Sequence, residues 1–170
     1  MKIKLSECAQ IAEIVSAVAI VLSLIFVGFQ LKDNARATRS ATANAATAPM
    51  IAWYGNVGQN QQTSALLYNN IGKDPDTVDP DEWFQFVMSM HAQMLIHQNN
   101  YYLVEEGTLE LEIRDSLAQT LSAIKDQPGF IRFWQQRKSI FFPEFQRYID
   151  ELLASSLDLS SDLYDDVPTE

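Results

Sequence analysis

The chain has 170 residues and a formal net charge of −10, from 12 Lys and Arg against 22 Asp and Glu. Its length fits about one domain, and its 47% apolar residues exclude a broadly disordered chain. The acidic balance argues against nucleic-acid binding, and one Cys with two His excludes a disulfide framework and a His- or Cys-rich metal site.

The strongest local signal is the apolar stretch 11–31, in which Glu13 and Gln30 are the only strongly polar residues. At a helical rise of about 1.5 Å per residue, this stretch crosses a hydrocarbon core of roughly 30 Å. A cleaved signal peptide is disfavoured because the small-residue sites at 41–43 and 46–48 lie well beyond the apolar stretch. A buried core helix is seldom apolar on all sides over such a length. We therefore predict an N-terminal flank at 1–10 and a transmembrane helix at 11–31.

Basic residues flank this predicted membrane helix on both sides. Lys32, Arg36 and Arg39 follow it, whereas Lys2 and Lys4 precede it. Lys and Arg are enriched on the cytoplasmic side of a span. The count of three basic residues after the helix against two before it therefore places the C-terminal domain in the cytoplasm.

Five residues of the predicted membrane helix are candidates for contacts with other helices. Ala12 with Ser16, and Ala19 with Ser23, are small pairs four residues apart that allow close helix approach. The two serines can also bond to carbonyls of their own helix. Glu13 is best interpreted as an interfacial carboxylate near the helix N-terminus. The alternative is an ion-coupled group in an oligomeric pore.

Residues 32–48 are rich in Ala and hold neither Gly nor Pro. Because Ala is the best helix former, we predict that the membrane helix extends through this stretch and ends before Pro49. A low-complexity linker is the alternative interpretation.

The helical bundle domain is predicted at 49–154. A helix restarts at 63–68, with Thr63 as its predicted cap. A long helix begins at Asp79-Pro80 and ends near Glu106-Gly107. Its apolar side chains occupy two adjoining faces. Thr108 is predicted to cap the next helix.

A short aromatic helix follows Pro128, and the last helix opens at Phe142-Pro143. No alternating strand pattern is found, so the fold is predicted to be all-α, with a transmembrane helix running into a small bundle. Residues 155–170 read as a frayed acidic tail.

Motifs for catalysis are absent from the sequence. It holds no phosphate-binding loop, no dinucleotide fingerprint and no nucleophile elbow. His91 and His97 are six residues apart and so lie on different faces of one helix. We therefore predict a protein that is not an enzyme, with no catalytic residue, no metal site and no cofactor.

An amide-rich and aromatic cluster supplies the candidate pocket. Because buried amides and phenols need hydrogen-bond partners, the favoured interpretation is a polar network in the core. The alternative is a pocket for a small amphipathic ligand or a partner peptide, beside a stripe of methionines at 88, 90 and 94. The cluster consists of His97, Asn100, Tyr101, Tyr102, Trp134 and Arg137.

The order of several motifs resembles a group of small uncharacterised bacterial membrane proteins that join one N-terminal transmembrane helix to a helical domain. The resemblance covers most of residues 10–153 and departs around 55–62, where this chain is richer in Gly, Asn and Gln. It implies a bacterial inner membrane location and supplies no functional residues. The motifs are Asn100-Tyr101-Tyr102, Glu106-Gly107-Thr108-Leu109, Pro128-Gly129-Phe130, Trp134, Arg137 and Phe142-Pro143-Glu144-Phe145.

Together these features predict a membrane-anchored interaction module or an accessory subunit of a membrane assembly. The partners expected are the lipid bilayer and either another protein or further copies of the chain, with no nucleic acid. The alternatives are a tethered ligand-binding or sensory domain and a homo-oligomeric channel.

Overall fold

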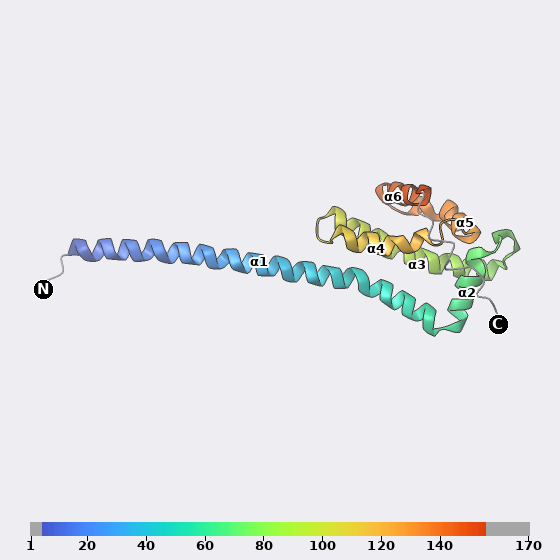
Figure 1. The fold of residues 1–170 in the computed structure, drawn as a ribbon, viewed down its shortest axis with the longest axis horizontal. Helices are drawn as coiled ribbons and strands as arrows, with labels where there is room; N and C mark the ends of the chain where they lie inside the picture. The colour runs from blue at the N-terminus through green and yellow to red at the C-terminus, as the bar shows by residue number, and fades with distance from the viewer. Residues whose placement is uncertain (1–4, 156–170) are drawn as a thin grey trace. The chain divides into compact units, whose positions relative to one another are not determined.

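The computed structural model describes residues 5–155, and all regular structure in that range is helical, which confirms the predicted all-α class (Figure 1). Residues 1–4 of the predicted flank and 156–170 of the predicted tail lie outside the described residues. The elements are α1 (Leu5–Gln59), α2 (Gln61–Gly72), η1 (Pro75–Thr77), α3 (Pro80–Glu105), α4 (Leu111–Ser122), α5 (Pro128–Arg137), η2 (Lys138–Ile140) and α6 (Pro143–Ala154).

The chain divides into two compact units, with the boundary between Ala41 and Thr42. The N-terminal part of α1 forms the first unit, and the second holds the rest of α1 together with α2 to α6. The predicted helicity of residues 32–48 is confirmed. The second unit is the helical domain.

The prediction that the first helix ends before Pro49 is wrong, because α1 contains Pro49 and continues to Gln59. A proline inside a helix loses one backbone hydrogen bond and costs roughly 3 kcal/mol. Packing on both sides of the proline opposes that cost, since Ala46 and Met50 are 0% and 1% exposed. These two residues are four apart and therefore share one buried face of α1.

The start of α2 differs from the sequence prediction in its capping residue. The side-chain oxygen of Asn60 accepts a hydrogen bond from the backbone N–H of Thr63 at 3.1 Å. Thr63 is therefore the third residue of α2, and Asn60 is the N-cap. Asn is as good a cap as Thr or better, so the helix begins at the earlier residue.

The ends of α3 lie where the local signals place them. The carboxylate of Asp79 accepts from the backbone N–H of Asp81 at 2.9 Å, and Pro80 is the first helical residue. The helix ends at Glu105, and Gly107 follows with φ of +68°. That left-handed conformation suits Gly and stops the helix.

Thr108 was predicted to cap the next helix, and this is wrong. Its hydroxyl and its backbone N–H both donate to the carbonyl of Leu103, each at 3.0 Å, so it closes the end of α3. The N-cap of α4 is Glu110, which makes no side-chain capping bond. A carboxylate there still interacts favourably with the helix dipole.

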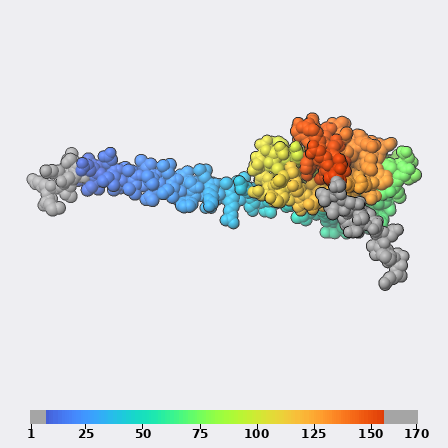
Figure 2. All heavy atoms as spheres, turned by 45° about the horizontal axis from the view of Figure 1, so that its top comes forward, coloured from blue at the N-terminus to red at the C-terminus, as the bar shows by residue number. Residues whose placement is uncertain are grey.

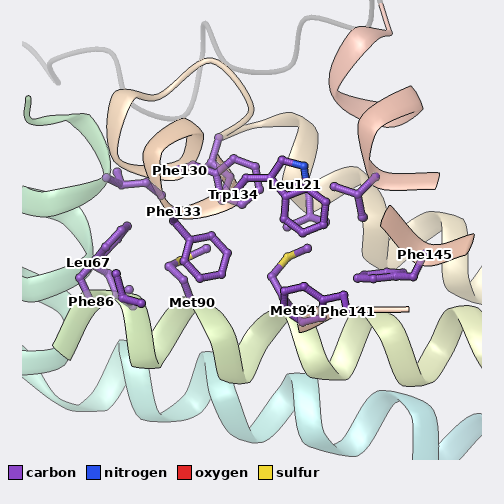
Figure 3. Close-up of a cluster of buried hydrophobic side chains, with 14 residues drawn as sticks. Leu67, Phe86, Met90, Met94, Leu121, Phe130, Phe133, Trp134, Phe141 and Phe145 are labelled. Atoms are coloured by element: carbon purple, nitrogen blue, oxygen red, sulfur yellow. The ribbon is translucent and has the colours of Figure 1, made fainter. Parts of the chain in front are cut away.

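The apolar core lies on one side of α3, beneath α2, α4, α5 and α6. In Figure 3 the labelled core side chains and the ribbon of α1 lie on opposite sides of α3. The atoms of α4, α5 and α6, coloured yellow to red in Figure 2, pack closely together. The buried core consists of Leu67, Ile71, Phe86, Val87, Met90, Met94, Leu121, Ile124, Phe130, Phe133, Trp134, Phe141, Phe145 and Ile149.

One glycine allows α5 to approach α2 closely. A Cβ atom at Gly129 would overlap the backbone carbonyl of Asn70 and lie 2.9 Å from the carbonyl oxygen of Ile71. No larger residue fits there without moving the backbone of one helix. Gly129 therefore fixes the distance between two helices that cover the core.

Candidate functional site

The most unusual feature of the helical domain is a polar stripe on α3, formed by Gln93, His97 and Asn100. Their spacing of four and three residues places them on one helix face, and they are 4%, 3% and 1% exposed. The side-chain nitrogen of Asn100 donates to the backbone carbonyl of Ala46 at 3.4 Å. This face of α3 therefore meets the C-terminal part of α1.

Each member of the polar stripe has an unpaired atom. Oε1 of Gln93, Nε2 of His97 and Oδ1 of Asn100 are buried without a hydrogen-bond partner among the described residues. A buried unpaired polar group costs about 1–3 kcal/mol. Burial also lowers the pKa of His97 to about 4, so its ring is neutral at pH 7.

Two of the six residues predicted from sequence, His97 and Asn100, thus share one buried face. Tyr101, the next residue along the chain, lies in a separate aromatic cluster. Its ring centroid is 5.1 Å from that of Tyr148. The guanidinium of Arg114 lies 5.8 Å from the Tyr101 ring and 4.7 Å from the Tyr148 ring, which is cation–π geometry.

Trp134 is part of the core and has its own polar partner. Its indole N–H donates to the carboxylate of Asp150 at 2.7 Å, and its ring stacks on Phe141 with 5.7 Å between centroids. Arg137, in the last turn of α5, lines a shallow groove with Trp83. Neither residue joins the polar stripe in one cavity.

Tyr102 is half exposed and lies in an open groove beside Leu95 and Phe142. The backbone N–H of Phe142 donates to the side-chain oxygen of Gln98 at 2.8 Å, which links the start of α6 to α3. Tyr102 is therefore a surface residue. The six predicted site residues therefore lie in different parts of the helical domain and do not line one common pocket.

A mainly apolar pocket lies elsewhere, between α1, α2, α3 and α4. Its volume is about 230 Å³, and Gln93 of the polar stripe forms part of its wall. Sequence reasoning missed it, although Ala46, Met50, Trp53 and Val57 recur at helical spacing across Pro49. The lining residues are Trp53, Tyr54, Val57, Ser64, Leu67, Tyr68, Ile71, Met90, Gln93, Thr120 and Ile124.

In the N-terminal unit, the five predicted helix-contact residues all lie within α1 on exposed positions. The hydroxyl of Ser16 donates to the carbonyl of Ala12 at 2.7 Å, so the expected bond back to its own helix is present. Glu13, Ala19 and Ser23 are exposed. By length and composition α1 contains a stretch that could cross a membrane, although a signal sequence has the same properties.

Among residues 5–155 there is no group of three or more His, Cys, Asp or Glu side chains that could hold a metal ion. Comparison of the chain with protein-family models, curated proteins and solved structures gives no match. The polar stripe holds buried hydrogen-bonding groups, and the neighbouring pocket offers mainly apolar contact.

Proposed function

We propose that this chain is a single-pass membrane protein whose helical domain docks a partner protein, as an interaction module or accessory subunit without catalysis of its own. The membrane part rests on the large apolar side chains between Ile11 and Leu31, which are 47–66% exposed. Lipid would cover this apolar surface. The location proposed is a bacterial inner membrane, with the helical domain on the cytoplasmic side.

The alternative of a cleaved leader conflicts with how the helical domain is packed. Cleavage after Ala48 would remove Ala46, which is fully buried and accepts the hydrogen bond from Asn100. Cleavage after Ala43 would leave the domain starting inside α1, two residues before the fully buried Ala46. Retention of α1 keeps both the anchor and the domain intact.

The docking part of the proposal rests on one observation, an apolar stripe exposed along α3. Phe84, Met88, Leu95 and Tyr102 are 61%, 37%, 45% and 50% exposed, and their spacing places them near one helix face. Phe142, 55% exposed, extends this surface beside Tyr102. We refer to these five residues as the docking face.

A protein partner fits the docking face better than the bilayer surface does. Beyond residue 39 the chain carries seven Lys and Arg against 19 Asp and Glu. Anionic headgroups would repel such an acidic domain. An amphipathic helix of another protein offers apolar side chains at the matching spacing, and basic flanks would add attraction.

The test uses full-length protein extracted gently from its own membrane, with native mass spectrometry of the purified particle. We expect a stoichiometric foreign chain, and we expect Leu95→Asp to lower its occupancy at least tenfold. Leu111→Asp is the matched control, because Leu111 is 49% exposed, lies outside the docking face and receives the same charge.

A partner that stays bound to Leu95→Asp would contradict the proposed docking face. A bare monomer would contradict docking altogether. A homo-oligomer without a foreign chain would favour the channel alternative and make Glu13→Gln the next variant.

A further inference from the structure

We propose that the pocket between α1, α2, α3 and α4 is a binding site for a small neutral aromatic molecule that carries one hydrogen-bond donor, such as an alkylphenol. All of its lining residues belong to the helical domain. None of them belongs to the docking face, so this inference is independent of the proposed function.

The size and the lining of the pocket define the body of the ligand. A cavity of about 150 Å³ lined by apolar side chains can hold benzene. The pocket here measures about 230 Å³, which suits a benzene ring with a short alkyl substituent. Trp53, Tyr54 and Tyr68 line it and favour an aromatic guest through edge-to-face contacts, and the two tyrosines, 44% and 61% exposed, leave the pocket open to solvent on one side.

The residues that line the pocket also determine the charge of the ligand. None of the residues that line the pocket is Asp, Glu, Lys, Arg or His. An ion that entered would lose hydration without gaining a charged partner, and this costs far more than the transfer of a neutral group. The pocket therefore selects a neutral molecule.

Gln93 would recognise the hydrogen-bond donor of the ligand. Its side chain is 4% exposed, and its Oε1 atom has no hydrogen-bond partner among the described residues. Because Gln93 lines the pocket, its amide is the group to which the hydroxyl of a bound ligand would donate. Because the oxygen is otherwise unpaired, the bond would recover a cost that the folded protein already carries.

Of the polar residues in the wall, Thr120 is already satisfied by its own helix. The hydroxyl of Thr120 donates to the carbonyl of Leu117 at 2.7 Å. Ser64 is half-buried on α2, so its hydroxyl can be hydrated. Gln93 is thus the lining residue whose polar group gains most from a ligand.

The experiment uses full-length protein in detergent micelles, labelled with 5-fluorotryptophan and observed by ¹⁹F NMR. The chain has three Trp residues, and of these Trp53 alone lines the pocket. The probes are 4-ethylphenol, which has a donor, ethylbenzene, which lacks it, and 4-ethylbenzoate, which is charged. Trp53→Phe assigns the reporter signal.

We expect 4-ethylphenol to shift the Trp53 signal saturably, with half-saturation at roughly 0.1–1 mM for a ligand of this size. The signals of Trp83 and Trp134 should stay in place. Ethylbenzene should bind about tenfold more weakly, and 4-ethylbenzoate should not bind. Parallel, unsaturable shifts of all three signals would show partition into the micelle and would overturn the proposal.

Gln93→Met tests the donor recognition, because Met keeps the length of the side chain and removes the amide. We expect half-saturation by 4-ethylphenol to rise about tenfold, which corresponds to about 1.4 kcal/mol, with ethylbenzene unchanged. Wild type and Gln93→Met are measured in the same micelles, so partition of the probes into the detergent cancels in the comparison. An unchanged preference for 4-ethylphenol over ethylbenzene in Gln93→Met would overturn the role of the amide.

Discussion

The buried face of α3 has an apolar side and an adjoining polar side. On the apolar side Val87 and Met94 are at most 4% exposed and join the core beneath α2, α4, α5 and α6. On the polar side, Gln93 and Asn100 are as deeply buried, and Asn100 reaches the backbone of α1. One helix face thus has an apolar edge and a polar one.

The contrast teaches that burial serves different purposes on the two sides. Full burial of a large apolar side chain stabilises a fold by about 1.5–3 kcal/mol. Burial of an amide or an imidazole with an unpaired atom costs stability. The apolar side of α3 therefore holds the domain together, whereas the polar side carries unpaired atoms, of which Oε1 of Gln93 is the one that the proposed ligand would engage.

The largest effect is expected in the apolar core. Phe86→Ala should lower the free energy of unfolding of the helical domain by about 3–5 kcal/mol, because it leaves a cavity in the core. Phe84→Ala is the control, since Phe84 lies two residues away on the same helix and is 61% exposed. Urea unfolding followed by Trp fluorescence measures both, and equal losses would contradict the assigned core side.

The next largest effect is a pH dependence from the polar side. The pKa of His97 is lowered from 6.5 to about 4 by burial, so the folded state disfavours the protonated ring. The unfolded chain binds the proton near pH 6.5 and the folded chain only near pH 4. Stability is therefore fully present above pH 6.5 and falls as pH decreases to 4, by up to about 3 kcal/mol.

His97→Leu should remove this part of the pH dependence. Unfolding of both proteins at pH 7.5 and pH 4.5 gives the comparison, and His91, whose pKa is also lowered by burial, is present in both. The drop in the free energy of unfolding between pH 7.5 and pH 4.5 should be larger for wild type than for His97→Leu. Equal drops would show that the fold does not keep the His97 ring neutral.

The smallest effect is expected for Gln93→Met, and it has the opposite sign. The substitution removes an unpaired buried oxygen and keeps the volume, so the free energy of unfolding should rise by about 1 kcal/mol. The melting temperature of the full-length protein without any added ligand measures this change. A decrease would mean that the amide already makes a stabilising bond in the free protein.

Local signals in the sequence predicted several helix ends correctly. The pairs Asp79-Pro80 and Phe142-Pro143 mark the starts of α3 and α6, and Gly107 follows the end of α3. A cap or a proline acts on its own helical turn, so such signals can be recognised without knowledge of the fold. The pocket could not be found in this way, because four helices line it.

The sequence by itself determined that the chain is helical and that residues 11–31 form a helix apolar enough for a membrane, since both depend on residues close together along the chain. Tertiary structure decided that α1 passes through Pro49, because buried Ala46 and Met50 hold the helix on both sides. It also decided that Gln93, His97 and Asn100 are buried with an unpaired atom each among the described residues. Hydrophobic periodicity marks buried positions, but only contacts between distant segments decide whether a buried amide finds a partner.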